Sequence, residues 1–484
     1  MSEPSLDPRD WEAARKSFHA AADCCLEWLL DIRSRPVWQE TPPAVKDALA
    51  EPLPASGTSL DALVDMFRSD ILPHATGNLH PRFFGWVHGA GTVAGALGEM
   101  LAGFMNSNVA GRDHVAVYVE RQVIEWCKTI FGFPAAASGL LTTGTSMASI
   151  IALAVARDAK GGADIRRRGI AAAPHRPVFY ASREAHGAIA KACALLGLGE
   201  DALRMVPAGA DFTLSVADLA AMIAADRAAG LAPAAVIATA GTVNTGAIDD
   251  LGAIAALCRA EGLWLHVDAA FGGLAILTPE FRSALLPMRE ADSIAFDFHK
   301  WLQVPYDAGC VLVRDEARHR ASFSARREYL AHDGEALAGG DPWYCEYGPE
   351  MSRGFRALKV WFTIKAYGID ALAGVIARNC ADARHLGKRI EASRVLSLLA
   401  PVSLNIVCFR FAPPGAPRAS LDGVNEAIVA ALQRDGIAAP STTRIGGQLA
   451  IRVCVTNHRT TAADLDLLAR EVGRLGRALL REAA

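Results

Sequence analysis

The residues best suited to chemistry are a lysine that follows one apolar run and an aspartate that ends another. Lys300 lies in residues 297–301 (DFHKW), directly after the run 293–296, and Asp268 follows the run 263–267. A lysine that loses its proton in a partly desolvated pocket can form a Schiff base with an aldehyde. A nearby carboxylate can keep a pyridine nitrogen protonated, which makes the ring an electron sink. The pair predicts a pyridoxal 5'-phosphate (PLP) site, although a lone lysine would ordinarily lie on the surface.

Two further residues could contact the ring of such a cofactor. His186 follows the apolar run 177–180, and its imidazole could stack on the ring close to the reacting carbon. A histidine that caps a helix is the structural alternative. Ala270 comes two residues after Asp268, and its small side chain would leave room for the flat ring against the backbone.

A turn of small residues offers a place for a phosphate. Residues 141–149 (LTTGTSMAS) lead into an apolar helix, with Gly144, Thr145 and Ser146 at the turn. Backbone N–H groups and hydroxyls at a helix N-terminus bind phosphate well. The Gly-Lys-Ser/Thr ending of a Walker loop is missing. Helix capping explains the motif equally well when it is taken alone.

A glycine pattern at residues 89–95 (GAGTVAG) competes as a nucleotide site. It is a GxGxxxG, a loose relative of the dinucleotide fingerprint, and it follows the β-like run 83–87. No second strand that ends in an acidic residue follows it, and such patterns arise readily in a chain rich in glycine and alanine. We therefore do not expect a nicotinamide cofactor.

The elements that must position these residues predict an α/β fold. Short apolar runs at 177–180, 234–238, 263–267, 293–296 and 310–313 alternate with helical segments. Such runs, separated by crossovers of a dozen or more residues, are typical of a mostly parallel sheet with helices on both faces. Sites in such sheets lie at the carboxyl ends of strands, where Asp268 and Lys300 fall.

Composition shifts divide the chain into three parts. Residues 1–80 form a proline-punctuated helical arm, with helical spacing at 11–33 and 60–72, which packs on a partner subunit or on its own core. Residues 81–375 form the large α/β domain. Residues 376–484 form a smaller α+β domain, with strands at 402–411 and 448–455 and helices at 424–433 and 462–480.

The overall composition narrows the class of protein. A formal net charge of -3 without a basic stripe argues against nucleic-acid binding. The acidic first ten residues do not resemble a signal peptide, and no uninterrupted apolar run reaches membrane-spanning length, so we expect a cytoplasmic protein without a membrane partner. The 10 cysteines show no Cys-x-x-Cys spacing, so no metal site is expected.

Taken together and in order, these motifs resemble the pyridoxal-dependent group II decarboxylases, the family of aromatic-L-amino-acid, histidine and animal-type glutamate decarboxylases. The resemblance covers about residues 75–370 and implies a fold of the PLP-dependent transferase type (fold type I). The motifs that carry it are residues 80–84 (HPRFF), 144–145 (GT), 185–186 (AH), 241–242 (GT), 265–270 (LHVDAA), 298–302 (FHKWL) and 353–361 (RGFRALKVW).

The resemblance implies a role for each matching residue. Lys300 would carry the Schiff base, Asp268 would face the ring nitrogen and His186 would lie over the ring. Tyr329 matches a loop tyrosine that the family uses to protonate the carbanion after carbon dioxide leaves. The residues around the cofactor phosphate would be Gly144, Thr145, Ser146 and His299, and Thr242 would also bind the cofactor. Those on the substrate side would be Phe83, Phe84, Trp86, His88 and Arg353.

These roles predict decarboxylation of an L-amino acid to its amine. The aromatic strip at residues 83–88 and the Trp301 that follows Lys300 favour an aromatic substrate. The alternatives are a decarboxylase of glutamate, histidine or 2,4-diaminobutyrate, an aldehyde synthase or other PLP lyase, and a PLP-binding protein without catalysis. The family also implies a homodimer whose active sites draw on both subunits.

Several residues depart from the family pattern. Asp297 stands where many relatives carry Asn or Ser near the phosphate, and a carboxylate there would be repulsive unless it points away or pairs with a cation. Val243 replaces a second threonine, Met147 stands where aromatic decarboxylases often carry serine, and His88-Gly89 replaces a common Pro-Thr pair.

Overall fold

The large domain is organised around one seven-stranded sheet. The structure, a computed structural model, describes residues 5–161, 165–324 and 336–482. The strands lie in the order β2-β8-β7-β6-β5-β3-β4, and the neighbours from β7 to β4 are all parallel, while β8 is antiparallel to β7 and β2. The prediction of a mostly parallel sheet is confirmed. The strands are β2 (Ser138–Thr142), β3 (Pro177–Ser182), β4 (Leu203–Val206), β5 (Ala232–Thr239), β6 (Trp264–Asp268), β7 (Ser293–Asp297) and β8 (Gly309–Val313).

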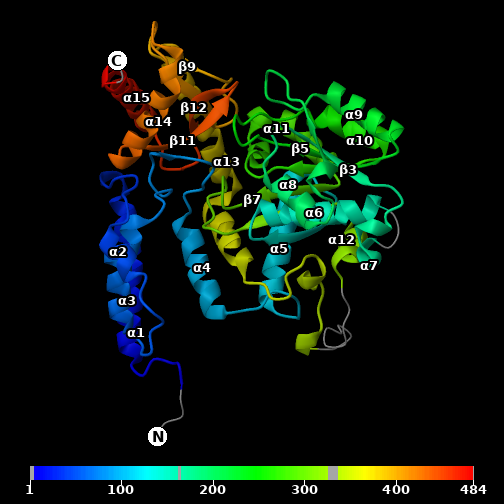
Figure 1. Cartoon of the computed structure of the whole chain (residues 1–484). Helices are drawn as coiled ribbons and strands as arrows, with labels where there is room; N and C mark the ends of the chain where they lie inside the picture. Colours follow the sequence, from blue (N-terminus) through cyan, green and yellow to red (C-terminus); the bar gives the residue numbers. More distant parts are fainter. Residues whose placement is uncertain (1–4, 162–164, 325–335, 483–484) are drawn as a thin grey trace.

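Helices cover both faces of this sheet, as Figure 1 shows. Almost every side chain of the central strands is buried, which is why these segments read as continuous apolar runs. One face carries α6 (Thr145–Lys160), α8 (Ala188–Leu195) and α12 (Glu316–Phe323), with the short α7 (Ile165–Arg168) beside them. The other carries α5 (Val115–Phe131), α9 (Val216–Ala228), α10 (Leu251–Glu261) and α11 (Pro279–Leu285).

The small domain has its own sheet of five strands in the order β1-β11-β12-β10-β9. The predicted strands and helices are present, but β9 and β11 were not predicted. The predicted boundary at residue 81 places β1 in the large domain, whereas β1 pairs with β11. The elements are β1 (Phe83–Phe84), β9 (Leu396–Leu398), β10 (Ile406–Phe411), β11 (Ala439–Ile445), β12 (Gln448–Cys454), α14 (Arg418–Arg434) and α15 (Ala462–Glu482).

The long helix α13 (Arg356–Glu391) joins the two domains, so the predicted boundary at residue 375 falls inside an element. By length and composition alone α13 could cross a membrane. Its backbone leaves the helical conformation at Gly368, with φ 73° and ψ 158°, and it contacts α4, α5 and α15. The sequence shows no uninterrupted apolar run here, because Lys359, Lys365 and Asp370 lie within it.

The N-terminal arm forms a helical column beside the body of the protein (Figure 1). It contains α1 (Trp11–Leu30), α2 (Pro43–Ala48) and α3 (Leu60–Met66), and it is followed by α4 (Val93–Met105). The Asp10 carboxylate caps α1 by accepting from the N–H groups of Glu12 and Ala13. The rings of Phe18 on α1 and Phe104 on α4 lie 5.3 Å apart, which joins the arm to α4.

Candidate active site

The two predicted acidic residues end two neighbouring parallel strands. Asp268 is the last residue of β6 and Asp297 is the last residue of β7, and these strands pair with each other. Lys300 follows three residues after the end of β7. Because the carboxyl ends of parallel strands meet at one edge of a sheet, the fold brings these groups together as the spacing predicted.

Lys300 and Asp297 form a close ion pair. Lys300 Nζ lies 2.9 Å from Asp297 Oδ2, and Asp297 Oδ1 accepts a hydrogen bond of 2.6 Å from the backbone N–H of Thr145. His299 Nε2 lies 3.7 Å from Asp297 Oδ2. The Asp297 side chain is almost fully buried, so the carboxylate is matched by a cation and a helix N-terminus. This pairing explains how a carboxylate is accommodated at this position.

Asp268 is a buried carboxylate that accepts one hydrogen bond from the residues that the structure describes. Its Oδ1 accepts from the backbone N–H of Ala270 at 3.1 Å. Burial raises the pKa of Asp268, and the charges of Lys300 and His186 oppose this rise only in part. A protonated ring nitrogen would supply the missing positive charge, so Asp268 fits the role predicted for it.

The phosphate end of the site is built at the start of α6. Gly144 precedes the helix, and the Thr145 hydroxyl is buried without a hydrogen-bond partner among the described residues. A buried hydroxyl at a positive helix end is short of an acceptor, and a phosphate oxygen would supply one. The residues present therefore fit PLP.

Three other residues predicted to bind the cofactor differ in their surroundings. Ser146 is exposed on the first turn of α6. The buried Thr242 hydroxyl lies 3.0 Å from Thr245 Oγ1 and accepts from the N–H of Ala247, so its own loop engages it. His299 Nδ1 accepts from the N–H of Ala308, and burial lowers the pKa of its ring. His299 is thus held in a fixed orientation beside Asp297.

His186 lies on the turn after β3, where it is exposed. Its Nδ1 accepts from the N–H of Ala188 at 3.2 Å, which is the helix-capping contact that was the structural alternative. A positive charge on His186 would oppose the rise in the pKa of Asp268. The contact of His186 with the cofactor ring stays a prediction. Tyr329 falls outside the described residues.

The aromatic strip divides between the site and the small domain. Phe84 belongs to the core of the small domain, so its predicted contact with substrate is wrong. Phe83 packs on Val37 and Ala439, and its ring lies 5.7 Å from that of His88. Trp86 is 58% exposed, with its ring 5.8 Å from His88.

His88 is half-buried and lies within the electrostatic influence of Lys300. Burial and the positive charge of Lys300 both lower the pKa of His88, which favours the neutral form of its ring. A residue that the sequence did not predict, Tyr306, lies between the two histidines: its ring is 5.7 Å from His88 and 4.3 Å from His299. The only sequence signal for Tyr306 as a site residue was its position six residues after Lys300. That spacing does not show whether the loop turns toward the site.

Arg353 has a structural role in place of the predicted contact with substrate. Its guanidinium bonds to both oxygens of Glu120 at 2.6 and 3.1 Å, and to the carbonyls of Val109 and Leu141. Both side chains are fully buried. Arg353 therefore ties α5 to the strand β2 that leads into the phosphate turn.

The GxGxxxG pattern is explained by close packing. A Cβ on Gly89 would lie 2.3 Å from the carbonyl oxygens of both His299 and Lys300, and a Cβ on Gly95 would lie 2.4 Å from Pro305. These glycines let residues 89–95 approach the backbone around Lys300. The pattern serves the lysine site and not a nucleotide.

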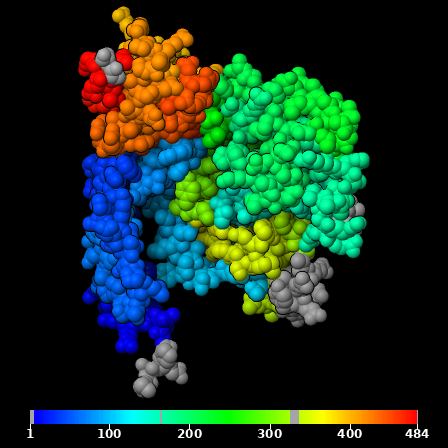
Figure 2. Space-filling model, viewed as in Figure 1, coloured from blue at the N-terminus to red at the C-terminus, as the bar shows by residue number. Residues whose placement is uncertain are grey.

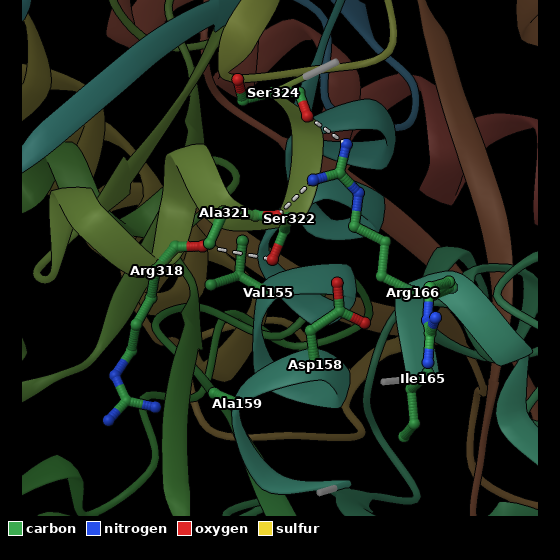
Figure 3. Close-up of a pocket in the computed structure, with 10 residues that line it drawn as sticks. Val155, Asp158, Ala159, Ile165, Arg166, Arg318, Ala321, Ser322 and Ser324 are labelled. Atoms are coloured by element: carbon green, nitrogen blue, oxygen red, sulfur yellow. Dashed lines mark hydrogen bonds between the residues drawn. The ribbon is translucent and has the colours of Figure 1, made fainter. Parts of the chain in front are cut away.

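A large cavity in the described part of the chain lies elsewhere. It has a volume of about 860 Å³ and lies between α6, α7 and α12, and none of the predicted site residues lines it. Figure 3 shows the Arg166 guanidinium reaching the carbonyls of Ala321 and Ser324, which closes the C-terminal end of α12. We therefore assign Arg166 a structural role.

The site and the fold define a PLP-dependent enzyme of fold type I. The family model "Pyridoxal-dependent decarboxylase conserved domain" matches residues 42–412, so the chain belongs to the pyridoxal-dependent decarboxylase family. It is a PLP-dependent amino-acid decarboxylase, a carboxy-lyase.

Similar proteins include several decarboxylases. The chain is 32% identical to an aromatic-L-amino-acid decarboxylase of Bacillus atrophaeus, over 94% of this chain and 93% of that protein. It is 33% identical to an L-2,4-diaminobutyrate decarboxylase of Rhizobium meliloti (strain 1021), over 89% and 84%. The crystal structure of Oryza sativa TDC with PLP and tryptamine matches with a TM-score of 0.90 and 27% identity, over 98% of this chain and 100% of that chain.

Proposed function

We propose that this enzyme decarboxylates an aromatic L-amino acid to the corresponding amine and carbon dioxide. The observation that carries the proposal is a group of aromatic rings that includes His88. The His88 ring lies 5.8 Å from that of Trp86 and 5.7 Å from that of Tyr306, and burial and the charge of Lys300 favour its neutral form. A neutral aromatic wall suits a flat, uncharged side chain better than a carboxylate or an ammonium group.

Each residue has one task in this proposal. PLP, when bound, supplies the ring that accepts the electron pair released as carbon dioxide leaves. Lys300 holds the cofactor between turnovers and gives way to the substrate amine. Asp268 keeps the proton on the ring nitrogen of PLP. His186 stacks on one face of the PLP ring. Tyr329, together with His186, would deliver a proton to Cα.

The test is a panel of L-amino acids assayed for amine and carbon dioxide with added PLP. DOPA, Tyr, Phe and Trp should give both products in equal amounts, whereas Glu and His should give neither. Lys300→Ala should abolish steady turnover, because no amine remains to release the product. Formation of aldehyde and peroxide instead of amine would contradict the proposal, as would near-normal turnover by Lys300→Ala.

A second candidate substrate is L-2,4-diaminobutyrate. It is favoured by the 33% identity to the L-2,4-diaminobutyrate decarboxylase of Rhizobium meliloti. Its second amine would need an acidic partner in the substrate pocket. Adding L-2,4-diaminobutyrate to the panel separates the two candidates, since only this one predicts 1,3-diaminopropane as product.

We also propose a homodimer. On α4 the exposed residues Val93, Leu97, Met100 and Phe104 follow one another at helical spacing and form one apolar stripe. Trp11 and Leu30 of the arm are 66% and 84% exposed, and Figure 2 shows the arm extending beyond the body. Contiguous apolar surface of this kind marks an interface. Light scattering should give twice the mass of one chain, and a fully active monomer would exclude the dimer.

We further propose that the enzyme works in the cytoplasm. All 10 cysteines are free, and nine of them are buried. Free cysteines in this number are typical of a reducing compartment. Fractionation of cells that produce the protein tests this, and activity recovered outside the cytoplasm would contradict it.

A further inference from the structure

Asp297 places a buried negative charge where the cofactor phosphate must bind. Its Oδ1 accepts from the backbone N–H of Thr145, the first residue of α6, and its Oδ2 lies 2.9 Å from Lys300 Nζ. The Thr145 hydroxyl, which has no hydrogen-bond partner in the described part of the chain, belongs to the same residue. One helix N-terminus therefore serves both the carboxylate and the predicted phosphate group.

The surroundings of Asp297 leave it little room to move. A Cβ on Gly309 would lie 2.8 Å from Asp297 Oδ1, and one on Gly144 would lie 3.4 Å from it. The backbone of β8 and of the phosphate turn thus close around the carboxylate. A phosphate that reaches Thr145 must come close to Asp297, and two anions at one helix end repel each other.

Lys300 has to leave Asp297 when the cofactor is attached. Its ammonium group first loses a proton to solvent, its nitrogen then bonds to the aldehyde carbon, and the aldehyde oxygen leaves as water. The carboxylate then loses its nearest cation just as the phosphate arrives. The pairing seen here therefore stabilises the cofactor-free enzyme.

We propose that Asp297 is an internal anion that occupies the phosphate end of the cofactor-free site and so weakens the binding of PLP. Asp297 is a positioning residue: it acts through Thr145 and Lys300. The inference depends on the cofactor and not on which amino acid is decarboxylated, so a failed substrate panel would leave it standing.

The test compares cofactor-free wild type with Asp297→Asn, which keeps the shape and the acceptor for the Thr145 N–H. Titration with PLP, followed by absorbance, should show a dissociation constant lower by about tenfold or more in the variant, because the repulsion is gone. Pyridoxal, which lacks the phosphate, should bind with a change of less than about threefold. Inorganic phosphate should raise the melting temperature of the variant more than that of wild type.

A matched control makes the same change at the opposite end of the same sheet. Asp292 lies just before β7, where its carboxylate accepts from the N–H of Leu265. Asp292→Asn should leave the affinity for PLP unchanged. If Asp297→Asn folds poorly, Asp297→Ser serves as the second variant. In the absence of PLP, we expect both variants to melt at a lower temperature than wild type.

Two results would overturn the inference. Equal or weaker binding of PLP by the Asp297 variants would mean that the carboxylate does not compete with the phosphate. An equal gain in affinity for PLP and for pyridoxal would mean that Asp297 acts through Lys300 alone and not through repulsion of the phosphate.

Discussion

Among single residues, Asp268 is the one that most clearly needs a positively charged partner. It ends β6 in the interior, where burial raises its pKa and, among the described residues, only the N–H of Ala270 donates a hydrogen bond to it. A buried carboxylate of this kind binds a cation strongly because water cannot compete. Asp268 would therefore keep the ring nitrogen of PLP protonated, as the sequence predicts.

We predict that Asp268→Asn lowers kcat by about 100-fold or more, because a neutral amide cannot stabilise the ring proton. The variant should still bind PLP covalently through Lys300, which absorbance will show. Asp250→Asn, a change at an exposed helix cap on α10, is the control and should leave kcat unchanged. A decrease of less than threefold in Asp268→Asn would contradict the assignment.

Among the elements, α5 and β2 are joined by the buried pair of Arg353 and Glu120. Glu120 also accepts from the N–H of Leu141, and Arg353 donates to the carbonyl of the same residue. Both backbone groups of Leu141 are thereby held just before the phosphate turn. The pair fixes the approach of β2 to that turn.

We predict that Arg353→Met lowers the free energy of unfolding by about 3 to 5 kcal/mol, since it leaves the Glu120 charge buried alone. Adding Glu120→Gln should recover part of that loss. Arg384→Met, which breaks an exposed pair with Glu280, should cost less than about 1 kcal/mol. An unchanged melting temperature with a raised KM would instead make Arg353 a substrate contact.

In the whole molecule, buried histidines couple stability to acid pH. His319 is fully buried, with Nδ1 2.8 Å from Ser138 Oγ and Nε2 2.8 Å from the carbonyl of Tyr347. Burial lowers the pKa of His319 to about 4. The unfolded chain therefore takes up a proton on this residue at a higher pH than the folded protein does.

We predict that stability falls as the pH drops from about 6.5 to about 4, and that His319 contributes about 3 kcal/mol to this loss. His319→Gln should be less stable at pH 7 but should show a flatter decline below pH 6.5. His19→Gln on the exposed side of α1 should leave the decline unchanged. Chemical unfolding across this pH range measures all three, and parallel curves for His319→Gln and wild type would contradict the prediction.

The amino-acid sequence by itself determined the class of fold and the main chemical groups of the site. Buried parallel strands leave continuous apolar runs, and residues that end such strands gather at one edge of the sheet. Asp268, Lys300 and the turn at Gly144 could therefore be placed from local order alone.

Only the tertiary structure decided which side chains meet across distant segments. It joined β1 to the small domain, which buried Phe84 there, and it paired Arg353 with Glu120. It also brought Asp297 between Lys300 and Thr145. Such contacts depend on how loops and domains pack, and no periodicity along the chain records that. The sequence indicated the chemical groups, while packing decided which of them face the cofactor.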